Sequence, residues 1–68
     1  MLSKIRLSTN KLILAMAEEC LNPYDLCQKA DIQYATYKRA TQTGLIKPAT
    51  AGKIAKALNV KVQDLLED

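Results

Sequence analysis

The 68-residue sequence contains no histidine, tryptophan or phenylalanine, and only two residues each of glycine, proline and cysteine. Without histidine, two cysteines cannot complete the four-ligand set of a structural zinc site. Two separated glycines do not form a glycine-rich phosphate loop, and no side chain stands out as a nucleophile with its base. Three tyrosines are too few for a platform that stacks on single-stranded nucleic acid. We therefore expect no enzyme activity, no metal and no cofactor.

Long apolar runs are also missing. The longest, residues 12–17, is far below the roughly 20 residues that a membrane span needs. The first residues lack the charged, apolar and small-residue pattern of a secretory signal. The sequence therefore predicts a cytoplasmic location and no membrane partner.

The two cysteines lie seven residues apart, at Cys20 and Cys27. The favoured interpretation is that both are buried, reduced thiols that pack as small apolar side chains. A disulfide or a redox sensor is the alternative.

Charge is distributed unevenly along the chain, whose formal net charge is +3. Residues 1–61 hold all ten Lys and Arg but four acidic residues, a net charge of +6, and the last seven residues carry −3. A basic body suggests a polyanionic partner, although basic residues also form ordinary solvated surfaces.

The pattern of apolar residues predicts one all-α domain over residues 1–68. Such a short chain buries only about 60% of the surface that it exposes when unfolded, so every helix must contribute to one core. Residues 1–7 form an arm, helical or extended. A helix capped by residue 8, 9 or 10 should run to about residue 20. Its core positions are Leu12, Ala15, Met16 and Cys20.

Ile13 and Leu14 lie partly off this stripe, so the first helix either packs on two sides or offers apolar surface to a partner. The pair Asn22-Pro23 is a strong start signal for a helix over residues 23–30. Asp31 suits a tight turn, because Asp tolerates the left-handed region. A third helix should span residues 34–42 and end near Gly44.

Residues 45–47 form a connector, and Pro48 opens a helix that ends at residue 59. One or two further helical turns follow, so residues 48–66 form the C-terminal helices. No segment alternates convincingly enough to predict a strand.

Residues 23–42 resemble the helix-turn-helix of the λ-repressor/Cro (Xre) family. The family's apolar positions correspond to Leu26, Ala30, Ile32, Tyr37 and Ala40, and its small residue to Cys27. Residues 47–60 and 64–66 are similar to the helices that follow the motif. The resemblance implies a compact λ-repressor-like bundle of four to five helices that binds double-stranded DNA.

Three positions depart from the family pattern. Asp31 stands where Gly is usual, at little expected cost. Pro23 replaces a phosphate-binding Gln, so backbone N–H groups of Tyr24 or Asp25 would have to replace that contact. Leu45 and Ile46 occupy a connector that is often polar, which either follows the DNA backbone or packs inward.

The resemblance also implies a set of DNA contacts. Base edges should be met by the exposed part of the third helix: Gln33, Tyr34, Ala35, Lys38 and Arg39. Phosphates should be met by Tyr24, Thr36, Lys47, Thr50 and Lys53, with weaker expectations for Asn10, Lys11 and Lys29. Tyr37 is expected in the core.

The function that we expect is sequence-specific binding of duplex DNA by a repressor-like transcription regulator. Two copies should bind a pseudo-palindromic site, forming a homodimer through residues 60–66 and the N-terminal arm. The alternative is a protein-interaction adaptor that keeps the fold without binding DNA, which the apolar residues Ile13, Leu45 and Ile46 would favour.

Overall fold

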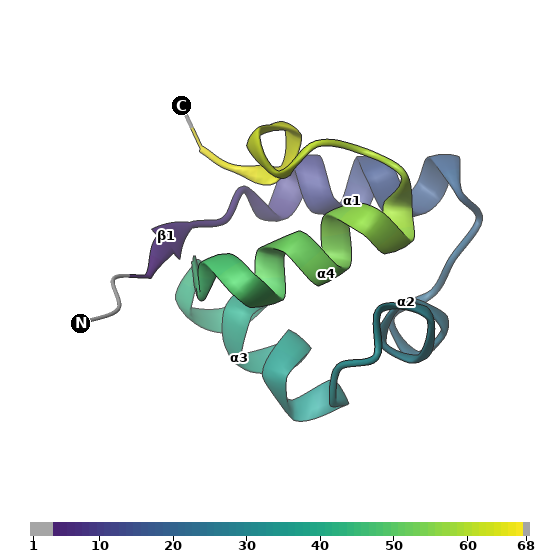
Figure 1. Cartoon of the computed structure of the whole chain (residues 1–68), viewed down its shortest axis with the longest axis horizontal. Helices are drawn as coiled ribbons and strands as arrows, with labels where there is room; N and C mark the ends of the chain where they lie inside the picture. Colours follow the sequence, from purple (N-terminus) through teal and green to yellow (C-terminus); the bar gives the residue numbers. More distant parts are fainter. Residues whose placement is uncertain (1–3, 68) are drawn as a thin grey trace.

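The computed structural model describes residues 4–67 as a small helical bundle with one short sheet (Figure 1). The elements, in chain order, are β1 (Ile5–Arg6), α1 (Thr9–Glu18), α2 (Pro23–Ala30), α3 (Tyr34–Thr43), β2 (Leu45–Ile46), α4 (Pro48–Leu58) and the 3-10 helix η1 (Val62–Leu65). The all-α prediction is confirmed, with four α-helices and one 3-10 helix in this part of the chain.

Helix α4 lies at the centre of the bundle, packed against α2 and η1 (Figure 1). Its residues Ile54 and Leu58 are almost fully buried. They meet buried leucines from every side of the molecule: Leu7, Leu12, Leu26 and Leu65. Burial of each of these side chains stabilises the fold by roughly 1.5–3 kcal/mol. The single core that the chain length requires therefore has α4 as its axis.

The predicted helix boundaries at Asn22, Asp31, Gly44 and Asn59 are confirmed. The Asn22 side chain accepts a hydrogen bond of 2.8 Å from the Asp25 backbone N–H at the start of α2. Asp31, Gly44 and Asn59 adopt left-handed backbone conformations, with φ of 59°, 73° and 59°, and end the three helices that precede them. Helix α1 takes Ser8 as its cap.

The predicted end of the first helix was wrong. Helix α1 stops at Glu18, and Cys20 adopts a left-handed conformation with φ of 57°. The Leu21 N–H then reaches back to the Met16 carbonyl at 3.0 Å, which places Leu21 partly against the core. Cys20 is exposed instead of buried, so the expectation of two buried thiols holds only for Cys27, and both thiols are free.

The expectation of no strand was also wrong. The arm pairs antiparallel with the connector, Ile5 opposite Ile46 and Arg6 opposite Leu45. These strands are too short to show an alternating pattern in the sequence. Residues 5 and 6 of the arm are therefore extended, and the connector packs inward through Ile46, which is 3% exposed.

The C-terminal segment holds the other side of the arm. Leu7 and Leu66 form an isolated bridge, and the Ser8 N–H donates to the Leu65 carbonyl at 2.8 Å. Leu7 and Leu65 are buried inside this copy, so neither apolar side chain is available to the homodimer contact expected through residues 60–66 and the arm. Within residues 4–67, no helix has the length and apolar character needed to cross a membrane.

Candidate nucleic-acid interface

Helices α2 and α3 cross closely around a small side chain. Cys27 is 5% exposed, and its carbonyl accepts a hydrogen bond of 3.0 Å from the Ile32 N–H in the turn. Tyr37 and Ala40 are buried on the inner face of α3. The tight turn and this packing fix the angle of α3 and leave its other face on the molecular surface.

The outer face of α3 is exposed along its whole length. Because successive helical residues are 100° apart, the middle of this face is formed by Ala35 and Gln42, with Lys38 on one side of it and Arg39 on the other. Tyr34 lies at one edge of the face, next to α2, and Arg39 lies at the other edge, toward β2 and α4. Each edge is built differently.

The Tyr34 edge is an aromatic stack. The rings of Tyr24 and Tyr34 are 4.6 Å apart and nearly parallel, at 16°, and Tyr34 in turn stacks on Tyr37 at 6.0 Å. The Tyr37 hydroxyl donates to the Met16 sulfur at 3.8 Å in the core. Gln33, the N-cap of α3, makes no side-chain capping hydrogen bond. The stack therefore ties the start of α3 to α2 and to the core without a side-chain cap.

The pKa values of two tyrosines in the stack, Tyr34 and Tyr37, are raised. Hydrogen bonding with the Tyr24 side chain is the first cause that raises the pKa of Tyr34, followed by desolvation. Burial raises the pKa of Tyr37, with a smaller effect of Cys27. Near neutral pH the Tyr34 hydroxyl is therefore neutral, and it can donate a hydrogen bond to an anion.

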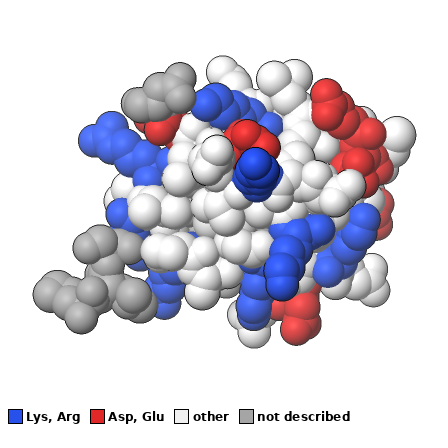
Figure 2. All heavy atoms as spheres, turned by 45° about the horizontal axis from the view of Figure 1, so that its top comes forward, with Lys and Arg blue, Asp and Glu red and all other residues white. Residues whose placement is uncertain are grey.

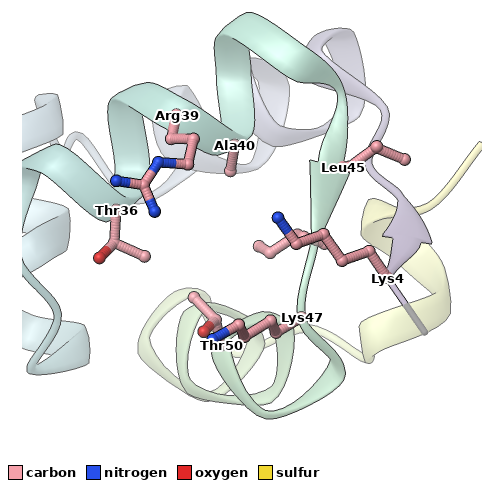
Figure 3. A pocket seen from close by; sticks show the side chains of 8 residues that line it. Lys4, Thr36, Arg39, Ala40, Leu45, Lys47 and Thr50 are labelled. Atoms are coloured by element: carbon pink, nitrogen blue, oxygen red, sulfur yellow. The ribbon is translucent and has the colours of Figure 1, made fainter. Parts of the chain in front are cut away.

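The Arg39 edge borders a basic pocket between α3, β2, α4 and the arm. We call it the basic pocket; its polar lining residues are Lys4, Thr36, Arg39, Lys47 and Thr50. Its volume is about 150 Å³, and the buried residues Ala40 and Ile46 are part of its wall. Figure 3 shows the side chains of Lys4, Arg39, Lys47 and Thr50 directed toward one space. None of the residues lining it is acidic.

Charge is spread unevenly over the surface. In the view of Figure 2, the largest group of acidic side chains lies at the upper right, and Lys and Arg are scattered over the rest of this face. Helix α1 ends at Glu18, next to Glu19, whereas α3 contains Lys38 and Arg39 and no acidic residue. The surface around α3 is therefore suited to a polyanion.

The residues expected to contact phosphate are separated by the structure. Thr36, Lys47 and Thr50 come together in the basic pocket, while Tyr24 lies on the opposite edge of α3. Lys53 is exposed on α4 outside that pocket. Lys47 is the N-cap of α4, without a side-chain capping bond.

The weaker candidates lie elsewhere. The Lys11 ammonium donates to the Leu66 carbonyl at 3.0 Å, so this side chain ties α1 to the C-terminal segment. Asn10 is exposed on α1, and Lys29 is exposed in the last turn of α2. The backbone N–H of Asp25, considered as a phosphate donor, is already bonded to Asn22.

Two residues of the candidate interface were missed by the sequence analysis. Gln42 lies on the exposed face of α3, and helical periodicity from Ala35 would have identified it. Lys4 reaches the basic pocket because β1 pairs with β2, and this pairing leaves no signal in the sequence.

Comparison with known proteins gives one result. A sequence model of the Cro/C1-type HTH DNA-binding domain matches residues 11–68, which include α2, α3, α4 and all of α1 except its first two residues. No curated protein and no solved structure matches the chain.

Proposed function

The chain belongs to the Cro/C1-type helix-turn-helix DNA-binding domain family, and from this premise we propose that it is a repressor-like transcription regulator that binds specific duplex sequences. The observation that supports this most is the exposed face of α3, which has a tyrosine stack at one edge and a basic pocket at the other. The major groove of DNA is about 12 Å wide and accepts one α-helix. In this proposal α3 enters the groove, and its two edges approach the two strands.

Base contacts are assigned to the middle and the start of this face. Lys38 is placed to donate to guanine O6 and N7, and the methyl group of Ala35 to meet a thymine methyl. Gln33 and Gln42 carry amides that suit adenine, and the Gln33 side chain is not used for capping. Tyr34 completes the base-contacting set.

Phosphate contacts are assigned to the two edges and to the neighbouring surface of α4. Tyr24 would donate its hydroxyl on one side, while Thr36, Lys47 and Thr50 would act on the other. Lys53 is the outermost member of this set. Such contacts set the position of the protein without distinguishing sequences.

Two copies on a pseudo-palindromic site remain part of the proposal, because one module of this size buries too little surface for strong affinity alone. Half-sites should then lie about 10 base pairs apart, or a multiple of this. Sizing of the complex by sedimentation would give the number of copies bound per duplex.

The test is selection of bound duplexes from random DNA, performed in parallel with the wild-type chain and with Lys38→Ala. The wild type should enrich a defined motif, and Lys38→Ala should lose preference at one base position by about 5- to 150-fold, the discrimination expected of a good base contact. Lys56→Ala, a change of another exposed lysine, should enrich the wild-type motif. Failure of the wild type to enrich any motif would contradict sequence-specific binding.

A protein-interaction adaptor is the second candidate, supported by Ile13 and Leu14, which are 53% and 65% exposed on α1. Ile46, which had favoured this alternative, is buried in the core. An adaptor would enrich no duplex in the selection, and Ile13→Ser with Leu14→Ser would abolish its interaction with its protein partner. In a DNA-binding regulator the same double variant should keep the enriched motif.

A further inference from the structure

The basic pocket has the chemistry of an oxyanion site. Three cationic side chains, Lys4, Arg39 and Lys47, line it together with the hydroxyl-bearing Thr36 and Thr50, and no acidic residue is among its lining residues. Guanidinium and ammonium groups are the usual partners of phosphate in proteins. The polar composition of the pocket therefore selects an anion with several acceptor oxygens.

The size and the surroundings of the pocket fit a phosphate group. A cavity of about 150 Å³ can hold a benzene molecule, and a phosphate group is smaller. Lys47 is the N-cap of α4 and Thr50 lies in its first turn, and the amino end of this helix favours negative charge through the helix dipole. The buried Ala40 and Ile46 give the pocket a rigid wall.

The arm supplies one of the three cations through the sheet. Lys4 immediately precedes β1, and the pairing of Ile5 with Ile46 sets Lys4 beside β2 and the pocket. The backbone bond from the Leu7 N–H to the Gly44 carbonyl, at 2.9 Å, fixes the arm against the end of α3. Lys4 is therefore held by ordered backbone next to the helix that meets DNA.

Arg39 is directed away from the middle of the α3 face. Figure 3 shows its guanidinium beside Thr36 and facing the same space as the Lys4 and Lys47 side chains. A side chain so placed lies over the edge of the groove, where the DNA backbone runs. Lys38 lies on the Tyr34 side of the face and does not line the basic pocket.

We propose that the basic pocket binds a single backbone phosphate of duplex DNA, and that Lys4 and Arg39 both contact this phosphate, so Arg39 does not contact bases. The proposal rests on the proposed function. In this proposal the arm contacts DNA directly through Lys4, and Arg39 contacts a phosphate instead of the base that the sequence analysis expected.

The test compares wild type, Lys4→Ala, Arg39→Ala and the control Lys56→Ala on the selected duplex and on a duplex with one mismatched base pair, over a series of salt concentrations. Lys56 is exposed near the end of α4. It lines a different pocket and is not among the residues that line the basic pocket. Loss of one phosphate contact lowers the slope of log K against log salt by about 0.9, which corresponds to about eightfold weaker binding at 0.1 M salt. Lys4→Ala and Arg39→Ala should each show this loss equally on both duplexes, and Lys56→Ala should show none.

Neutral methylphosphonate groups placed one at a time in the duplex locate the phosphate. At one position, wild-type binding should fall about eightfold, and Lys4→Ala and Arg39→Ala should lose little further affinity there, because the contact is already absent. When a methylphosphonate replaces any other contacted phosphate, both variants should lose as much DNA affinity as the wild type does. Thermal unfolding of each variant checks that the fold is retained.

Three results would overturn the proposal. If Arg39→Ala changes the ratio of the affinities for the matched and mismatched duplexes, Arg39 contacts a base. Unchanged binding by Lys4→Ala would remove the arm from the site. The third result has two parts: 10 mM phosphate weakens DNA binding equally in all variants, and no single methylphosphonate position removes the effect of both Lys4→Ala and Arg39→Ala. Together these would show that the pocket binds free anions instead of a DNA phosphate. In each case the wild type still selects a motif; if it selects none, the proposed function fails as well.

Discussion

At the scale of single residues, the two glycines differ in backbone conformation: one is left-handed and the other is helical. Gly44 ends α3 with φ of 73°, whereas Gly52 lies inside α4, and an added Cβ would meet no atom within 4 Å at either position. Gly44→Ala should therefore destabilise the fold by about 1 kcal/mol, the cost of a side chain in the left-handed region. Gly52→Ala is the matched control and should stabilise by about 0.5 to 1 kcal/mol, because Ala favours helix. Urea unfolding gives both values, and equal signs would contradict the account.

The two thiols differ in exposure, and this difference predicts their reactivity. Cys20 is exposed, whereas Cys27 is buried and burial raises its pKa. Because the thiolate is the reactive form, a disulfide reagent should label Cys20 rapidly and Cys27 only on unfolding. Cys20→Ser should leave a chain with one slow thiol. Two fast thiols in the native wild type would show that the core around Cys27 opens readily.

Stability should fall at alkaline pH. Burial raises the pKa of Cys27 and of Tyr37 above their unfolded values, so the unfolded chain releases these protons first as pH rises. Their contribution is thus complete below the unfolded pKa values and is lost as pH rises toward the folded ones. The free energy of unfolding measured by urea should decrease between about pH 8 and about pH 10, and less so for Cys27→Ala. An increase over this range would contradict the assignment.

Residue types with strong local preferences are those that the sequence predicted correctly. Asn22, Asp31, Gly44 and Asn59 each have a backbone or capping preference that acts without help from distant residues. Cys20 was misassigned because a left-handed turn at a cysteine has no such preference. Helical periodicity was the only reason to predict Cys20 as a core position of the first helix.

At the scale of elements, capping makes α2 a separately testable unit. Asn22 bonds the Asp25 N–H at 2.8 Å, and a lost N-cap typically costs about 1 kcal/mol. Asn22→Ala should therefore lower the free energy of unfolding by about this amount and weaken DNA binding, because α2 supports α3. Asn10→Ala, inside α1, is the matched control and should cause no loss of stability. Equal losses in the two variants would contradict the capping role.

The sheet is the element that sequence reasoning could not find. Strands β1 and β2 have two residues each, and their pairing joins positions about 40 residues apart. No local pattern specifies such a contact; it follows from how α3 and α4 place the connector. The basic pocket depends on the same contact, so Lys4 was absent from the predicted site although Thr36, Lys47 and Thr50 were present.

At the scale of the whole molecule, most of the core packing holds α3 in place and leaves one face of this helix exposed. Helix α4 packs against α2 and η1, the α2–α3 turn sets the angle of α3, and β1 pairs with β2 at the end of α3. Exposed apolar residues on α1, Ile13 and Leu14, lie outside this arrangement. The molecule therefore has a polar face around α3 and a separate apolar surface on α1.

The most direct test of this division is to titrate the ¹⁵N-labelled chain with its selected duplex and to map the amide chemical-shift changes. The largest changes are expected on residues 33–43, on the start of α2 and on the backbone around Lys4, Lys47 and Thr50, with small changes around Ile13 and Leu14. The largest changes on α1, with α3 unaffected, would contradict the claim that the exposed face of α3 is the DNA-binding surface.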